Sequence, residues 1–251
     1  MASMRPLNER ILANPYTTGL VASAVIGSIW MINDYKQWRA FGTGGTPPNV
    51  YDSCIGSSGY CRMTLFRILF AYHIPRQTNP ETLSTEGPSY LKESLPPRAG
   101  GRPKLMPRIL PQRQVPEPID PGTREQLLTL MRRLADEHPD ILETKPSATE
   151  GKTTDGLYAR KDNANINPLV KSETTLDHEI GHAHPTDNGL HVWLSDPDAR
   201  QVIAAGWGQR FCLPMVQSGW IMVYAPRDSA ELRVIEDIVK AAVRWVTNVA
   251  I

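Results

Sequence analysis

The chain has 251 residues, of which 41% are hydrophobic, enough for one sizeable core but hardly for two full domains. Basic and acidic residues nearly cancel, 27 against 26, and leave a formal net charge of +1. This balance lacks the positive field that nucleic-acid binding requires, so we expect no nucleic-acid partner. The cysteines Cys54, Cys61 and Cys212 fit neither a paired zinc motif nor a dense disulfide framework, although Cys54 and Cys61 could bridge in an oxidising lumen.

An uncharged segment near the N-terminus is long enough to cross a membrane. Residues 14–33 contain no charged side chain, and about 20 such residues in a helix span a hydrocarbon core. Tyr16 and Trp30 lie near its two ends, as interfacial aromatic residues do. We therefore expect residues 1–40 to hold a single-pass transmembrane anchor, in the endoplasmic reticulum or another endomembrane. A cleaved signal peptide and a buried core helix are the alternatives.

The next part of the chain has no pattern of long elements. Residues 63–72 form a short apolar stretch with Arg67 in its middle, which favours an amphipathic helix. Residues 74–121 are rich in proline, which excludes a long helix or a central strand. We predict that residues 41–121 connect the anchor to a folded domain and wrap over its surface, with Ile109 and Leu110 available for packing.

Residues 122–251 show regular periodicity and should form the folded domain. Capping boxes at Thr123 with Gln126 and at Asp228 with Glu231 mark the starts of two helices. The predicted elements, in chain order, are a helix over 123–138, strands over 156–160, 179–184 and 189–194, a helix over 196–206, a strand over 219–225 and a helix from 228 onward. This order indicates an α+β fold, with helices packed on a mainly antiparallel sheet.

Histidines are concentrated in the two central strands. Four of the six fall within fourteen residues, at His178, His182, His184 and His191. Strand residues two apart share a face, so His182 and His184 should lie side by side, and His191 on the neighbouring strand can reach the same surface. Three such imidazoles could bind a transition metal or serve as general bases near neutral pH. The simpler interpretation is three hydrogen-bonded side chains at a solvated sheet edge.

Five further residues are candidates for the same site: Trp193, Trp207, Arg210, Tyr224 and Arg227. The tryptophans could wall a pocket, and either arginine could hold a carboxylate or an enolate. Arg227 also precedes a helix N-terminus, where anions are favoured. The alternatives are core packing for the aromatic residues and an ion pair with Asp228 or Glu231 for Arg227.

Several separated motifs resemble, in order and spacing, the fungal luciferases and the wider luciferase-like domain family. They are Asp34-Tyr35, Glu179-Ile-x-His-x-His184, Leu190-His191, Gly206-Trp-Gly-Gln-Arg210, Tyr224-Ala-Pro-Arg227 and Glu236-x-Ile-Val239. The resemblance covers nearly the whole chain and is strongest over residues 176–248. It implies a small membrane-associated enzyme. Light-emitting members add dioxygen to a 3-hydroxyhispidin-type α-pyrone without flavin or any recognised metal, and the peroxide loses carbon dioxide to leave an excited product.

One departure from the family pattern concerns light emission. Light-emitting members have histidine and proline directly after the Gly-Trp-Gly-x-Arg motif, whereas this chain has Phe211-Cys212-Leu213-Pro214. A non-luminescent relative is therefore favoured. Phe211 is expected to join the two tryptophans in walling a dry pocket.

Together these features predict a membrane-anchored tailoring enzyme, either a cofactor-independent oxygenase or an isomerase or lyase, of fungal secondary metabolism. Its substrate would be a small enolic, pyrone or polyketide-type metabolite, deprotonated with the help of His182, His184 or His191 and then oxygenated, decarboxylated or rearranged. No bound cofactor is expected, molecular oxygen is a candidate co-substrate, and a histidine-bound divalent metal stays open. The alternative is a non-catalytic, membrane-tethered binding or scaffold protein.

Overall fold

The computed structural model describes residues 14–40, 60–61, 64–65, 69, 77–106, 111–211 and 216–251. The chain forms two compact units, residues 1–41 and 42–251. Cys54, Cys212, Ile109 and Leu110 lie outside the described residues, so the Cys54–Cys61 bridge and the packing of Ile109 and Leu110 remain predictions. The same holds for most of the amphipathic helix predicted at 63–72.

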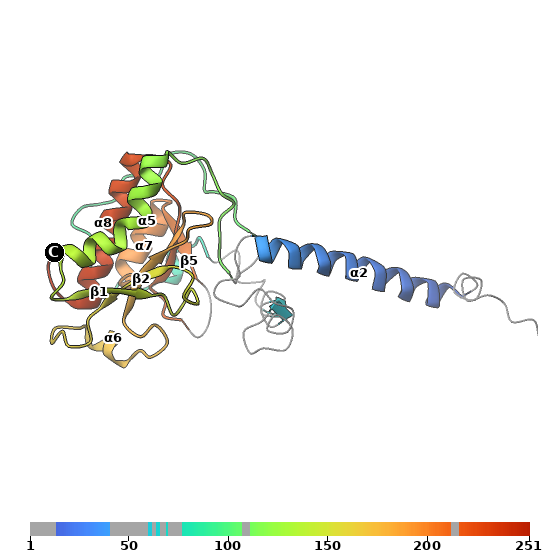
Figure 1. Ribbon diagram of the computed structural model, residues 1–251, viewed down its shortest axis with the longest axis horizontal. Coiled ribbons are helices and arrows are strands. Elements are labelled where there is room, and N and C mark those ends of the chain that lie inside the picture. The colour runs from blue at the N-terminus through green and yellow to red at the C-terminus, as the bar shows by residue number, and fades with distance from the viewer. Residues whose placement is uncertain are drawn as a thin grey trace, which may run out of the picture. The chain divides into compact units, whose positions relative to one another are not determined.

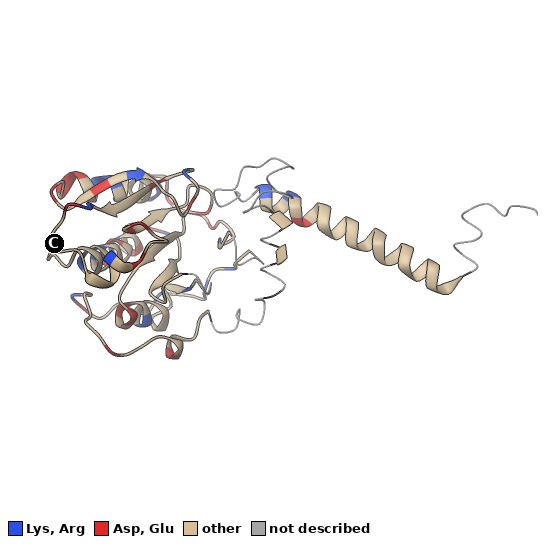
Figure 2. Cartoon of the chain, turned by 90° about the horizontal axis from the view of Figure 1, so that it is seen from below, with Lys and Arg blue, Asp and Glu red and all other residues tan. Residues whose placement is uncertain are grey.

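The first unit contains the helix α2 (Pro15–Ala40). Its 26 residues measure about 39 Å at 1.5 Å rise per residue. Within the described part of the chain, it is the one helix long and apolar enough to cross a membrane by length and composition. Charged side chains gather at one end of α2 in Figure 2, where the sequence has Asp34, Lys36 and Arg39. The predicted N-terminal apolar helix is therefore confirmed, as a candidate membrane span.

The second unit is built on a six-stranded antiparallel sheet with the strand order β1-β2-β3-β4-β6-β5 (Figure 1). The strands are β1 (Leu142–Pro146), β2 (Asp155–Ala159), β3 (Glu179–Ala183), β4 (Leu190–Trp193), β5 (Gly208–Arg210) and β6 (Trp220–Val223). With the helices that pack on it, this sheet confirms the predicted α+β class.

Helices cover one face of the sheet. They are α5 (Pro121–Glu137), α7 (Asp196–Ala204) and α8 (Ser229–Thr247), while α6 (Pro168–Ser172) and the short 3-10 helix η2 (Pro80–Thr82) lie in connections. In Figure 1, α5 and α8 run together across the sheet, and α7 contacts β5 and β6. Leu157 of β2, Val192 of β4 and Ile221 of β6 are fully buried on this face, and Ile235 of α8 belongs to the same core. Apolar side chains therefore hold the helices to the sheet.

Two helix starts differ from the predicted ones. The N-cap of α5 is Asp120, whose carboxylate accepts from the N–H of Thr123 at 2.9 Å, because Pro121 suits the first helical position. Ser195, one residue before the predicted start, caps α7 in the same way. Asp228 caps α8 as predicted. The strands β1 and β5 are absent from the predicted elements.

Hydrogen bonds attach the proline-rich segment to the sheet and helices of the second unit. Its backbone N–H at Arg98 donates to Ala205 at 2.8 Å, and Arg102 donates to the carbonyl of Gly208 at 2.7 Å. Residues 112–114 and the turn at 147–150 reach the sheet face opposite the helices. Two connections therefore cover that face.

Candidate functional site

A bulge in β3 determines which side chains face this second side of the sheet. Gly156 of β2 pairs with His182, whereas Tyr158 pairs with Glu179, so β3 has one extra residue between the two pairs. A bulge interrupts the alternation of side chains. Glu179 therefore projects to the same side as His182, with its Oε1 2.8 Å from Nδ1 of that histidine. His191 of β4 stands directly opposite His182.

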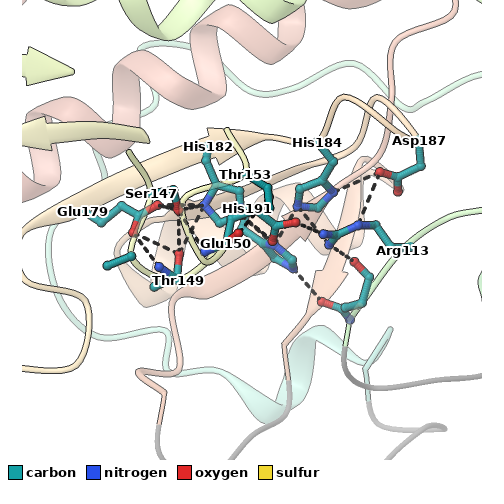
Figure 3. A network of polar contacts seen from close by, with 12 residues as sticks. Arg113, Ser147, Thr149, Glu150, Thr153, Glu179, His182, His184, Asp187 and His191 are labelled. Atoms are coloured by element: carbon teal, nitrogen blue, oxygen red, sulfur yellow. Dashed lines mark hydrogen bonds and ion pairs between the residues drawn. The ribbon is translucent and has the colours of Figure 1, made fainter. Parts of the chain in front are cut away.

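The three histidines converge in a buried cluster (Figure 3). Nε2 of His184 lies 2.9 Å from Nδ1 of His191, and that Nδ1 lies 3.4 Å from Nε2 of His182. One ring nitrogen of each histidine lies within 4.8 Å of one from each of the others. His182, His184 and His191 are 1%, 0% and 4% exposed. The cluster is therefore not a solvated sheet edge.

Each imidazole presents its other ring nitrogen to an oxygen atom. Nδ1 of His184 lies 3.1 Å from Oδ1 of Asp187, and Nε2 of His191 lies 3.1 Å from Oε1 of Gln112. The amide nitrogen of Gln112 donates to the carbonyl of Arg210 at 3.0 Å, which turns its oxygen towards the histidine. In the same manner, Nδ1 of His182 faces Oε1 of Glu179. Each outer nitrogen therefore carries the hydrogen, and each inner nitrogen carries the lone pair.

A carboxylate and a guanidinium from outside the sheet join the cluster. Glu150 places Oε2 3.5 Å from Nε2 of His182, and its other oxygen accepts a hydrogen bond from Arg113. The NH1 group of Arg113 also lies 3.3 Å from Nε2 of His184, and its Nε lies 3.8 Å from Asp187. Arg113 is 2% exposed and Glu150 is 6% exposed. Both charges are therefore shielded from bulk water.

The turn that carries Glu150 is anchored to the sheet through Glu179. Ser147 Oγ donates to Glu179 Oε1 at 2.6 Å and accepts from the N–H of Glu150 at 3.0 Å. The hydroxyls of Thr149 and Tyr158 donate to the other carboxylate oxygen at 2.9 and 3.0 Å. Both oxygens of Glu179 therefore have donors, as burial of a carboxylate requires.

Burial controls the protonation of the cluster. It lowers the pKa of His184 and His191 well below the ordinary value, and the neighbouring positive charges lower it further. Burial raises the pKa of Asp187 to about 6, against the opposing effect of Arg113. Burial alone would raise the pKa of Glu179, but the hydrogen bonds that it accepts leave the pKa below its usual value. Two of the imidazoles are therefore neutral near pH 7.

Aromatic rings border the cluster. Trp220 of β6 stacks on His191 with the ring centroids 5.9 Å apart, and its ring lies 5.8 Å from that of His182. Phe211 contacts His191 edge-on at 5.0 Å between centroids. The position at which this chain departs from light-emitting relatives therefore lies beside a cluster histidine.

Tyr224, directly after β6, is connected to the cluster through glutamines. Its hydroxyl lies 3.3 Å from Oε1 of Gln209, whose amide nitrogen donates to Gln77. Gln77 also accepts from Gln112 at 3.4 Å, and Gln112 faces His191. A buried chain of side-chain amides thus links this predicted site residue to the histidines.

The two predicted arginines make their contacts elsewhere in the domain. Arg227 forms an ion pair with Glu231 and donates to the carbonyl of Ala99 at 2.8 Å. Arg210 donates from its guanidinium to the carbonyl of Thr82 at 3.2 Å. The cation beside the histidines comes instead from the proline-rich segment.

The two predicted tryptophans belong to the apolar core. Trp193 and Trp207 are each 3% exposed. Trp207 donates from its indole nitrogen to the carbonyl of Pro96 at 2.7 Å, while Trp193 stands opposite Trp220 in the β4–β6 register. The tryptophan in ring contact with the histidines is Trp220.

The sequence interpretation overlooked the residues that orient the histidines. They are Gln112, Arg113, Ser147, Thr149, Glu150, Glu179, Asp187 and Trp220. Two of them carried a local signal, because Glu179 precedes and Asp187 follows a histidine by three positions. The others come from distant parts of the chain and gave none.

The structure defines a class of protein: an α+β domain whose antiparallel sheet bears a buried cluster of three histidines on one face. The model of the Luciferase domain family matches residues 177–242. The chain is 32% identical over 246 positions to a luciferase of Armillaria gallica, covering 91% of this chain and 86% of that protein. It is 29% identical over 258 positions to a luciferase of Neonothopanus nambi, covering 96% and 90%. No solved structure matches. The chain belongs to the fungal luciferase-like family.

Proposed function

We propose that this protein is a membrane-anchored enzyme that acts on a small enolic, α-pyrone or polyketide-type metabolite in fungal secondary metabolism. The histidine cluster assists removal of the enol proton. The electron-rich product then reacts with molecular oxygen, loses carbon dioxide or rearranges. Membership of the luciferase-like family supports this proposal.

The observation that carries the proposal is the convergence of three buried imidazoles on one face of the sheet. A neutral imidazole can accept a proton or bind a metal ion through its lone pair. A protonated imidazole has no free lone pair and can do neither. His184 and His191 have a lowered pKa and lie 2.9 Å apart through their ring nitrogens. Shielding from water also protects a carbanion from being quenched.

Membrane attachment is proposed from α2 alone. Its length and composition suit one span, and a lipophilic metabolite would concentrate in the membrane beside an anchored enzyme. An endomembrane such as the endoplasmic reticulum is the proposed compartment.

The test uses the full chain purified in detergent micelles. The protein is incubated with 3-hydroxyhispidin-type α-pyrones, and oxygen uptake and product mass are followed. His182→Ala and His184→Ala should each lower turnover about 100-fold or more. His138→Ala, at the end of α5, removes an imidazole outside the cluster and should leave turnover unchanged. Turnover that survives both cluster substitutions would refute the proposed site.

A second candidate function is a non-catalytic binding or scaffold protein. Phe211 favours it, because an apolar ring packs against His191 where light-emitting relatives have an ionisable side chain. Tight binding of the pyrone without turnover in the same assay would support this function.

A further inference from the structure

The lone pairs of the three imidazoles point at one another. Hydrogen bonds to Glu179, Asp187 and Gln112 hold the hydrogens on the outer nitrogens. A general base must direct its lone pair at a substrate, whereas these inner nitrogens are 2.9 and 3.4 Å from each other. Lone pairs that face each other at such distances repel unless a proton, a hydrogen-bond donor such as Arg113 or a metal ion lies between them.

The spacing of the inner nitrogens suits a metal ion. Two nitrogens bound to one ion at about 2.1 Å lie roughly 3.0–3.5 Å apart for the angles of octahedral or tetrahedral coordination. The two distances between neighbouring rings lie at or close to this range. The third pair is within 4.8 Å.

The charge of the surroundings also favours a cation. The described carboxylates around the imidazoles are Glu150, Glu179 and Asp187, and all are at least nine-tenths buried. Arg113 is the one guanidinium in contact with them among the described residues. Three carboxylates and one guanidinium give the surroundings of the imidazoles a formal excess of two negative charges. A divalent cation would neutralise it, and buried charge is costly unless neutralised.

We propose that Nε2 of His182, Nε2 of His184, Nδ1 of His191 and a carboxylate oxygen of Glu150 bind one divalent first-row transition-metal ion. Nitrogen donors select such ions over Mg²⁺ and Ca²⁺, which prefer oxygen ligands. Glu150 is placed to act as the fourth ligand, since its Oε2 lies 3.5 Å from Nε2 of His182. The inference deepens the proposed function and rests on it for the role of the cluster. A bound ion would hold the enol oxygen and favour loss of its proton.

The outer partners resemble the second shell of a metal site. Ligand histidines usually donate their other N–H to a carboxylate or carbonyl, which fixes the ring and raises its basicity. Glu179, Asp187 and Gln112 occupy these three positions. Glu179→Gln should therefore weaken metal binding by about 10- to 100-fold without removing a ligand.

The test is a titration with Co²⁺ of the full chain, produced without a histidine tag, stripped with a chelator and held in detergent. We expect one ion bound per chain, with visible d–d absorption bands typical of nitrogen and oxygen ligation. His184→Ala should abolish the bands. Glu150→Gln, which keeps the shape of the side chain, should shift the bands and weaken binding about tenfold or more.

His138→Ala is the matched control, because it removes an imidazole from the end of α5 and should leave affinity and spectrum unchanged. Glu150→Gln and Glu179→Gln keep side-chain volume, so they test the site even if His184→Ala does not fold. Bands unaltered in His184→Ala, or no bands in the unsubstituted chain, would overturn the metal site.

The outcome separates this inference from the proposed function. Turnover by metal-stripped protein at an undiminished rate would overturn a catalytic role for the ion and leave the proposed function standing. A bound Co²⁺ ion in a chain that turns over no pyrone would support the metal site and count against the proposed function.

Discussion

The two faces of the sheet are buried by different kinds of contact. The face under α5 and α8 presents Leu157, Val192 and Ile221 to an apolar core. The other face presents histidines, beneath two connections that supply Arg113 and Glu150. Both are shielded from water. However, the stability of the first face depends on how much apolar area is buried and how well the volume is filled. The stability of the second face depends on particular hydrogen-bond donors and acceptors.

The difference determines how each face should respond to substitution. Apolar burial is non-directional, so the loss of one methylene group removes a small, local contribution. A buried polar group depends on its partner, and removal of one partner leaves the other desolvated and unsatisfied. A single substitution on the histidine face should therefore destabilise the domain more than one of similar size on the apolar face.

The largest effect is expected at Arg113. Arg113→Met keeps much of the side-chain volume but leaves Glu150 and Asp187 without their cation. Loss of one partner from a buried charge pair lowers the free energy of unfolding by about 3–5 kcal/mol. Chemical denaturation of the two proteins measures the difference.

The matched control for that substitution is Arg133→Met on α5. Arg133 pairs with Glu137 and Glu236 at the surface, where its side chain is 43% exposed. Exposed pairs contribute about 0–1 kcal/mol. Equal destabilisation by the two substitutions would contradict the distinction between the buried cluster and the surface.

Acidification should also lower the free energy of unfolding, through the groups on the histidine face. Below about pH 6.5 the unfolded chain protonates His184 and His191, whereas the folded chain, with lowered pKa values, does not. Asp187 acts in the opposite direction, because its pKa of about 6 in the folded state lies above the unfolded value. The two histidines outweigh the one carboxyl, so the unfolded state binds more protons than the folded state below about pH 6, and the free energy of unfolding falls as the pH decreases.

Denaturation of chelator-treated protein at several pH values measures this slope without a contribution from a bound ion. A free energy of unfolding that stays constant or rises as the pH falls from 6 to 4 would contradict the protonation states assigned here.

The contrast between the faces also explains what the sequence could predict. Periodicity identified α5, β3, β4, β6 and α8, because each has a repeating apolar face or a run of apolar residues. It placed His182, His184 and His191 together, because alternation and the turn at Asn188 determine their register. Asn188 has a positive φ of 60°, as tight turns between strands often require. Local rules were sufficient wherever the partners are close in sequence.

The remaining parts of the site depend on contacts that no local rule describes. Gln112 and Arg113 come from a proline-rich segment without periodicity, and Glu150 comes from a polar turn. The bulge that aligns Glu179 with the histidines forms where β2 pairs with β3. On the other side of β3, a Cβ at Gly181 would lie 2.5 Å from the carbonyl oxygen of His191. Such close approaches become visible only when the strands are paired.

A smaller effect is expected on the apolar face. Ile235→Val removes one methylene group from α8 at a fully buried position in the core. The free energy of unfolding should fall by about 0.5–1.5 kcal/mol. The Co²⁺ spectrum and the turnover of folded protein should not change, since the histidine face keeps all its partners. Altered absorption bands in this variant would show that the two faces are coupled.

The smallest effect is expected at the far end of the glutamine chain. Tyr224→Phe removes a hydroxyl that lies 3.3 Å from Gln209 and accepts from Arg102 at 3.3 Å. Both contacts are long for hydrogen bonds of this kind, so the free energy of unfolding should fall by only about 0.5–1 kcal/mol. Turnover should stay within a few-fold of the unsubstituted protein, because Gln112 still holds His191. A drop of about 100-fold, with stability preserved, would instead assign the tyrosine hydroxyl a direct part in proton transfer.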